Sequence, residues 1–286
     1  MAKASDTAGK GANQLLSFRE WGDKQLRVYF DERIDKVFDV CCFSQPVTYV
    51  ADTSIFCRMG AKGNQVVIYS MTIEASNDLA MVLPVPVAEQ RNEESVQFVD
   101  LSNYPKFFTQ LDRGFPQNSF GNFGDTPKAQ PARSTLEVKQ VGSYSASFVP
   151  TVDDFDRLEP AFRIPSDTWK KLPEFSGYGF VVFKLRQGKH RVHPMAFAYP
   201  ARDKSRIVFP TVHIHDGEVH QKAEFDHSLY CQSTSGEVRM NWQESLAPMG
   251  RYILAPAAKG LIRGNEHCYK LSMMGELDNS DVEVPA

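Results

Sequence analysis

Six of the seven histidines lie between residues 190 and 227, and they are the residues whose type and spacing best fit a chemical role. Three of them, His213, His215 and His220, flank an Asp-Gly pair at residues 216–217. Asp-Gly between two alternating runs favours a two-residue β-hairpin turn, because a type I′ turn needs positive φ at both central positions. The pattern therefore predicts a hairpin in which His213 lies opposite His220.

The register of this hairpin predicts which side chains share a face. Three imidazoles and one carboxylate fall on one face: His213, His215, His220 and Glu218. The apolar side chains, Phe225 among them, fall on the other face, which is predicted to be the core. Opposed Cβ atoms lie roughly 5 Å apart, so the imidazoles can converge on one ion at Zn–N distances of about 2.0–2.1 Å.

This geometry predicts one bound transition metal, with zinc as the first expectation. The three histidines would be neutral ligands, and Glu218 would be a fourth ligand or would orient an imidazole. An open coordination position would then support a metal-dependent hydrolase or oxygenase-like enzyme.

A solvated, histidine-rich hairpin face explains the same residues. Lys222 and Glu224 continue that face and are typical of an exposed surface. His227 shares the apolar face with Phe225, which predicts a hydrogen-bonded, partly buried histidine and not a ligand. A non-enzymatic protein-interaction or structural β-module therefore stands beside the enzyme as the alternative function.

Alternating apolar and polar residues dominate the chain and predict a mainly β (β-rich α+β) fold with short peripheral helices. A helix is expected at 104–111, where apolar residues have helical spacing. The strands expected with the clearest patterns are 65–73, 79–85, 179–185, 192–199, 206–215, 218–232 and 269–273.

A long segment rich in glycine and proline, 114–134, is predicted to divide the chain. It separates a first β-unit (13–113) from a second (135–274), while residues 1–12 are predicted to be a disordered tail and 275–286 a mobile acidic tail. Segments 65–87 and 179–201 share an apolar strand, a polar turn and a second strand that begins with methionine. Both a duplication of two packed antiparallel units and convergent hairpins explain this likeness.

Composition narrows the classes of function. The formal net charge is −3 and the pI about 6.2, which argues against nucleic-acid binding through bulk positive charge. The sequence has no apolar run long enough for a membrane helix and no nucleotide-binding motif, so neither a membrane nor a nucleotide cofactor is expected. Five sparse cysteines favour a reducing compartment and hence a cytoplasmic protein. A protein partner and a homo-oligomer both remain open.

Three runs resemble an uncharacterised bacterial protein family. They are CCFSQPV (41–47), LAMVLPVPV (79–87) and FPTVHIHDGEVH (209–220). The resemblance implies a bacterial origin and a role that is still unknown, and it supplies no activity, cofactor or site residue.

Overall fold

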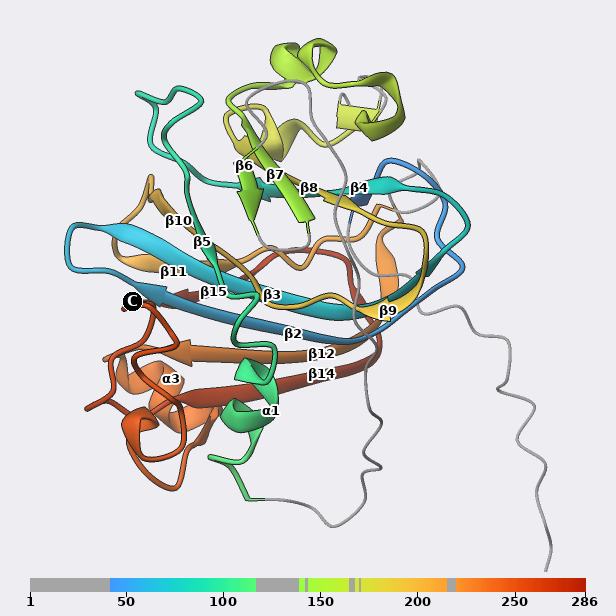
Figure 1. The fold of residues 1–286 in the computed structure, drawn as a ribbon. Helices are drawn as coiled ribbons and strands as arrows, with labels where there is room; N and C mark the ends of the chain where they lie inside the picture. Colours follow the sequence, from blue (N-terminus) through green and yellow to red (C-terminus); the bar gives the residue numbers. More distant parts are fainter. Residues whose placement is uncertain (1–41, 117–138, 142–143, 165–167, 170, 215–219) are drawn as a thin grey trace, which may run out of the picture. The chain divides into compact units, whose positions relative to one another are not determined.

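The computed structural model describes residues 42–116, 139–141, 144–164, 168–169, 171–214 and 220–286 (Figure 1). These residues all belong to one unit of the chain, Val37–Ala286. Strands arranged in sheets make up most of its regular structure, and the helices are short. The prediction of a mainly β fold is therefore confirmed. None of the helices in the described ranges is long and apolar enough to cross a lipid bilayer.

The larger sheet runs in the order β13-β14-β12-β2-β3-β10-β5, and β9 pairs with β3 beside β10. Its strands are β2 (Tyr49–Met59), β3 (Asn64–Ala75), β5 (Gln97–Asp100), β9 (Gly188–Arg191), β10 (Met195–Pro200), β12 (Lys222–Gln232), β13 (Gln243–Glu244) and β14 (Tyr269–Asp278). The sheet is mixed, because β12 pairs with β2 in parallel and the other pairs are antiparallel.

The smaller sheet is antiparallel throughout, in the order β1-β4-β8-β7-β6. Its strands are β1 (Cys42–Phe43), β4 (Leu79–Val85), β6 (Lys139–Val141), β7 (Tyr144–Val149) and β8 (Gly179–Leu185). Two further strands, β11 (Arg206–Phe209) and β15 (Val282–Pro285), form a two-stranded sheet.

Short helices connect and cover the strands. The α-helices with full bounds are α1 (Phe107–Asp112) and α3 (Gly236–Asn241), and the 3-10 helices are η1 (Val152–Arg157), η2 (Pro160–Phe162), η3 (Pro173–Phe175) and η4 (Met249–Arg251). The apolar side of α1, which includes Phe107, packs with Phe56 of β2 on the outer face of the larger sheet. The helix expected at 104–111 is thus present with shifted ends.

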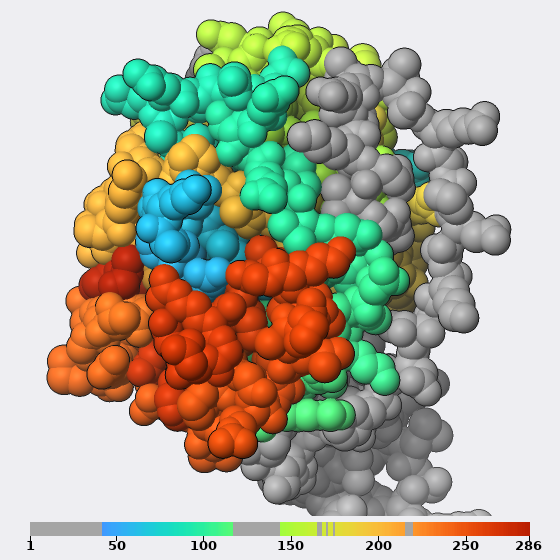
Figure 2. All heavy atoms as spheres, turned by 60° about the vertical axis from the view of Figure 1, so that its left-hand side comes forward, coloured from blue at the N-terminus to red at the C-terminus, as the bar shows by residue number. Residues whose placement is uncertain are grey.

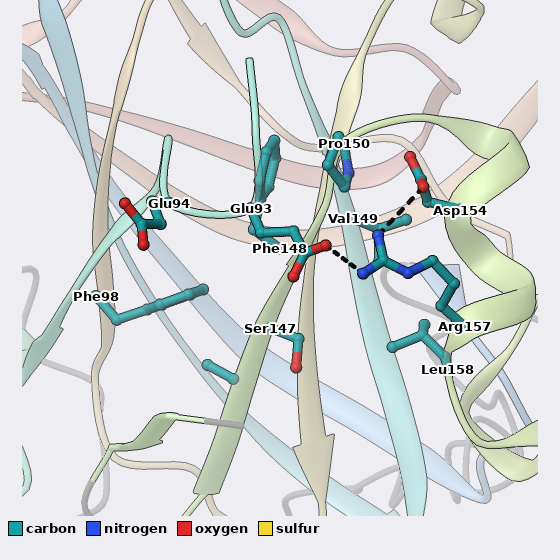
Figure 3. Close-up of a pocket in the computed structure, with 11 residues that line it drawn as sticks. Glu93, Glu94, Phe98, Ser147, Phe148, Val149, Pro150, Asp154, Arg157 and Leu158 are labelled. Carbon is teal, nitrogen blue, oxygen red and sulfur yellow. Dashed lines mark hydrogen bonds and ion pairs between the residues drawn. The ribbon is translucent and has the colours of Figure 1, made fainter. Parts of the chain in front are cut away.

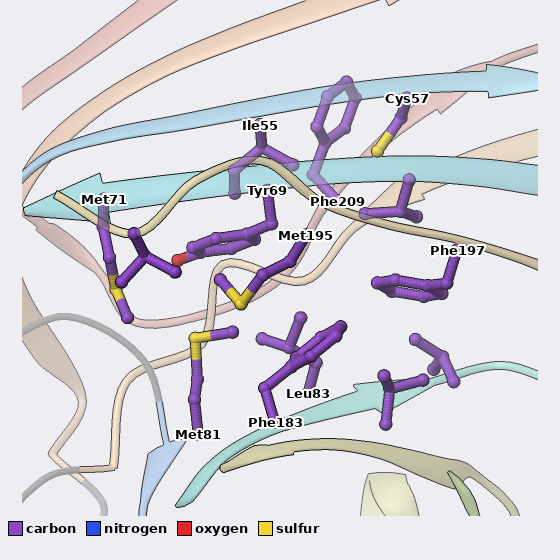
Figure 4. Packing of buried hydrophobic residues seen from close by; sticks show 14 of the residues in the cluster. Ile55, Cys57, Tyr69, Met71, Met81, Leu83, Phe183, Met195, Phe197 and Phe209 are labelled. Atoms are coloured by element: carbon purple, nitrogen blue, oxygen red, sulfur yellow. The ribbon is translucent and has the colours of Figure 1, made fainter. Parts of the chain in front are cut away.

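The main core lies between the two large sheets (Figure 4). Met81 and Leu83 point into it from β4, and Tyr69 points into it from β3. The alternate residues of β4, such as Val82, are also buried, in a second cluster on the far side of the smaller sheet. Because both faces of the central strands are covered, their sequences are continuous apolar runs and do not alternate.

Two long segments, 64–85 and 179–200, pair with each other in both sheets. In the larger sheet Tyr69 lies opposite Met195, and in the smaller sheet Met81 lies opposite Phe183. Each strand of one predicted repeat therefore pairs with a strand of the other, and the duplication itself stays a prediction. Strands from both sides of 114–134 share each large sheet, while residues 117–138 lie outside the described part, so the predicted domain division also stays a prediction.

Residues 275–286 differ from the mobile acidic tail that their composition predicts. β14 continues to Asp278, and β15 pairs with β11 from Arg206 to Phe209. The side chain of Val284 is buried in the main core, while the neighbouring Glu283 remains accessible. Buried and accessible residues alternate here as they do in an ordinary edge strand. The acidic residues occupy accessible positions, which is why composition alone predicts a tail.

Candidate functional site

The structure describes two of the four predicted metal ligands. His213 and His220 are described, while His215, Glu218 and the Asp-Gly turn lie outside the described residues. In the described parts of the predicted hairpin, β11 pairs with β15, and β12 pairs with β14 and β2. No cluster of three or more possible metal ligands is found among the described residues, so the four-residue site stays a prediction.

The prediction that His213 faces away from the core is wrong. Its side chain is 1% exposed, and its ring stacks on Phe225 with 4.3 Å between the ring centroids. Its neighbours Val212 and Ile214 are also buried, in the cluster on the outer side of the smaller sheet. The regular strand β11 ends at Phe209. Beyond it, the side chains of residues 212–214 are all buried, so both sides of the chain are covered there. Strict alternation between a core face and a water face therefore does not hold here.

His227 lies in the interior of β12, next to His213. The two ring centroids are 5.2 Å apart, and the side chain of His227 is 1% exposed. Among the described residues, neither of its ring nitrogens has a hydrogen-bond partner, nor does the hydroxyl of Thr53 on the adjoining strand β2. Burial lowers the pKa of His227 to about 3. The predicted burial is confirmed, but the expected hydrogen bond is absent from this part of the chain.

Asn279 joins the two ends of the segment that carries the predicted ligands. Its side-chain oxygen accepts a hydrogen bond from the backbone N–H of His213 at 2.7 Å. Its amide nitrogen donates to the carbonyl oxygens of His213 at 2.9 Å and His220 at 3.0 Å. The carboxylate of Asp281 accepts hydrogen bonds from the backbone N–H groups of Thr211 at 2.9 Å and Val212 at 3.0 Å. We refer to Asn279 and Asp281 as the polar clasp.

Replacing Asn279 with alanine is expected to lower the free energy of unfolding by about 1–3 kcal/mol, because polar backbone groups of His213 lose their partner. Urea denaturation measures the change. Asn279→Asp keeps the acceptor for the N–H of His213 and loses the donor, so its loss should be smaller. Equal midpoints for the parent and Asn279→Ala would show that the clasp contributes nothing to stability.

Ser245, His267 and Glu244 lie close together near the start of β14, but their hydrogen bonds are not those of a catalytic triad. Nδ1 of His267 lies 2.9 Å from the carbonyl oxygen of Ser245, 3.4 Å from its Oγ and 3.6 Å from Oε1 of Glu244. A catalytic triad needs the serine and the carboxylate on opposite ring nitrogens. In addition, Oγ of Ser245 donates to the carbonyl of Ala247 and accepts from the N–H of Cys268. This group therefore fixes a turn and is not arranged as a nucleophile.

A cleft opens between β7, η1 and the loop before β5 (Figure 3). Its charged groups pair with each other: Arg157 forms ion pairs with Glu93 and with Asp154. The two carboxylates raise the pKa of Arg157. The apolar part of the lining includes Phe98, Phe148 and Leu158. The arrangement is that of an ion pair that ties a loop to a helix.

The four described cysteines are buried: Cys42, Cys57, Cys231 and Cys268. Burial raises the pKa of the thiols of Cys57, Cys231 and Cys268. A thiolate nucleophile needs the opposite shift, so these side chains act as small apolar residues. The fifth cysteine, Cys41, lies outside the described residues.

β14 has the longest open edge among the described strands (Figure 1). β13 pairs only with Tyr269 and Lys270. Within the described part of the chain, no strand and no backbone hydrogen bond occupies the outer side of residues 271–277. Gly275 has φ of 88°, but the register with β12 continues without a shift to Asp278. The open edge therefore runs on to the end of β14, and its part before Gly275 is formed by Leu271, Ser272, Met273 and Met274. The sequence predicts a strand at 269–273 but does not show that this strand has an open edge, because that depends on which other strands pair with it.

The exposed apolar side chains lie on the same C-terminal part of the chain as this edge. They are Met240, Leu246, Leu254 and Met274, the last being 65% exposed. Figure 2 shows residues 236–268, which contain the first three, on one face of the molecule beside the turn between β2 and β3. On β14 itself, Met274 marks the open edge with an apolar group in water.

Comparison with models of protein families gives no match, and neither does comparison with curated protein sequences. The resemblance to a bacterial family therefore stays an expectation. Among solved structures, a crystal structure of baculovirus P35 matches with a TM-score of 0.43 and 12% sequence identity, over 82% of this chain and 96% of that chain. At this score we draw no conclusion about function from the similarity.

Proposed function

We propose that this protein is a non-enzymatic interaction module that binds an extended segment of a partner protein along the edge of β14. The observation that carries the proposal is the open edge at Leu271, Ser272, Met273 and Met274. An edge strand presents unpaired N–H and C=O groups, and an added strand satisfies them. Natural proteins keep such edges short, and the other outer strands described here have four residues or fewer.

The side chains of this edge support strand addition. Leu271 and Met273 are half-buried against the main core, so their outer sides are available to a neighbouring strand. Met274 points to the opposite face of the sheet and is exposed. A bound segment would cover apolar surface with its alternate residues while its backbone extends the sheet.

Hydrogen exchange tests the proposal directly. A ten-residue peptide of alternating threonine and valine is expected to slow exchange of the alternate amides at 271–274 whose N–H groups point away from β12, and to leave those at 97–100, on the edge strand β5, unchanged. The same peptide with N-methyl groups on alternate residues removes its donors and should have no effect. If no extended peptide, neutral or charged, slows exchange at 271–274, the proposal is wrong.

A metal-dependent hydrolase or oxygenase-like enzyme at His213, His215, His220 and Glu218 is the second candidate. One observation favours it: the side chain of Asn279 binds the backbone of both His213 and His220, at either end of the segment that carries the other two ligands. The metal would be a transition metal, with zinc the first expectation.

Metal analysis of protein purified without an affinity tag tests this candidate. About one equivalent of zinc is expected, and it should be lost in His220→Ala, where the altered side chain is exposed. His213→Ala is a poorer variant, because that ring is part of the core. Protein that carries no metal, or whose metal content is the same in His220→Ala, would exclude the site.

A further inference from the structure

We infer that the segment received by the β14 edge is cationic, with basic residues alternating with apolar ones. The inference rests on the proposed function and names the chemistry of the partner. It follows from the charges on the two faces of β12 and β14 beside the open edge.

The outer face of these two strands is acidic. The register places four pairs of side chains directly opposite each other on that face: Lys222 and Asp278, Glu224 and Glu276, Asp226 and Met274, Ser228 and Ser272. The set contains four carboxylates and one lysine. Its only apolar side chain is the exposed Met274.

This negative charge is poorly balanced within the described part of the chain. Glu224 lies directly opposite Glu276, and like charges in opposed positions repel each other. Lys222 contacts Glu276 at 3.9 Å. Glu224, Asp226 and Asp278 have no ion-pair partner among the described residues. Asp226 instead accepts the backbone N–H of Asp52, whose own carboxylate lies 3.9 Å from the guanidinium of Arg191.

The positions of these carboxylates suit a strand added to β14. Glu276 and Asp278 lie on β14 itself, about 5 Å from an added strand, and Glu224 and Asp226 lie on the next strand, β12, about 10 Å from it. The nearer pair therefore lies within the Debye length of about 8 Å at physiological salt, and the farther pair contributes mainly at low salt. Lysine or arginine at alternate positions of the added strand would therefore face the carboxylates.

The opposite face of the added strand would meet apolar surface. Leu271 and Met273 lie on that side and pack against the main core. Apolar residues at the intervening positions of the partner would cover them. A second copy of this chain is a weaker fit, because its own β14 would bring Glu276 and Asp278 to a face that is already negative.

Three ten-residue peptides test the inference, in which valine alternates with lysine, threonine or glutamate. Fluorescence anisotropy of labelled peptides gives their affinities. The Lys/Val peptide is expected to bind at least roughly tenfold more tightly than the Glu/Val peptide at low salt, and the ratio should shrink as salt is added.

Removing carboxylates from the face provides the matched variants. Glu224→Gln combined with Glu276→Gln is expected to weaken Lys/Val binding by roughly threefold to tenfold and to leave Thr/Val binding unchanged. The same two changes should raise the melting temperature, because they remove the repulsion between opposed carboxylates. Glu89→Gln, which alters an exposed carboxylate between β4 and β5, is the control and should change neither quantity.

The outcomes separate this inference from the proposed function. If all three peptides bind equally and slow exchange at 271–274, the edge receives extended segments but the partner is not selected by positive charge. If none binds, and sedimentation shows a dimer with protected amides at 271–274, the occupant is a second copy and the cationic partner is excluded. If none binds to a monomer, both proposals fail.

Discussion

Lowering the pH from 7.5 to 5 is expected to reduce the free energy of unfolding by about 2 kcal/mol through His227 alone. The native pKa of this histidine is about 3, because its ring is buried between Phe225, His213 and β2. In the unfolded chain its pKa is about 6.5. Between these two values the unfolded state binds a proton that the native state does not. Stability is therefore full above pH 6.5 and falls as the pH drops toward 3.

His227→Phe isolates this contribution. The substitution keeps an aromatic ring against Phe225 and removes the titrating group. The free energy of unfolding should therefore fall by about 2 kcal/mol less than in the parent when the pH is lowered from 7.5 to 5. At pH 7.5 the variant should be at least as stable as the parent, since neither ring nitrogen of His227 has a hydrogen-bond partner among the described residues. Urea denaturation at several pH values measures both effects.

The parent protein, measured over the same pH range, is the reference for this series. If the curves of His227→Phe and the parent run parallel from pH 7.5 to pH 5, His227 does not remain neutral in the native protein.

Arg58→Ala is expected to lower the free energy of unfolding by about 3 kcal/mol. Arg58 is a buried residue, and its guanidinium donates to the carbonyl oxygens of Leu261 at 2.5 Å and Gly260 at 2.9 Å. Burial, followed by the nearby charge of Arg263, lowers the pKa of Arg58. Without the guanidinium these carbonyls lose their donors. The turn that holds Leu261 in the apolar cluster of Phe56 and Phe107 then loses its attachment to β2.

The same turn explains why Arg58→Lys should not restore full stability. Lys259 and Gly260 both have positive φ, which directs successive carbonyls toward one point. A planar guanidinium reaches them together, whereas an ammonium group cannot keep the same spacing, so Arg58→Lys should recover only part of the loss. Arg251→Ala, at an exposed position in the same region, should change stability little. Equal stability of Arg58→Ala and the parent would contradict this role.

The central strands were predictable from the sequence because their environment is uniform. The run 79–85 was predicted as a strand with the bounds that β4 has, and 65–73 differs from β3 by one or two residues at each end. Both runs are buried on two sides, so every residue carries the signal. By contrast, the acidic alternation of β14 and β15 has the composition of a tail, and only pairing with β12 and β11 makes it part of the sheet structure.

The candidate site was less predictable. Alternation predicts that the side chain of His213 faces away from the core, because it assumes that one side of a strand is buried and the other is exposed to solvent. Around residues 210–214 both sides are covered, and the bonds that fix the backbone come from Asn279 and Asp281, more than sixty residues away. No local pattern encodes such a contact. The open edge of β14 likewise depends on which strands do not pair there, and that is a property of the whole topology.

The pairing of 64–85 with 179–200 imposes an order on folding during synthesis. Because Met81 pairs with Phe183 and Tyr69 pairs with Met195, β4 can pair with β8 only after residue 185 has been synthesised, and β3 can pair with β10 only after residue 200. Until then β3 and β4 are apolar strands with open sides, which is when a chain is most prone to aggregate. Contacts over such separations also close slowly. Fragments that end before Met195 should therefore be insoluble, and expression of this protein should benefit from chaperones that shield the first half of the chain.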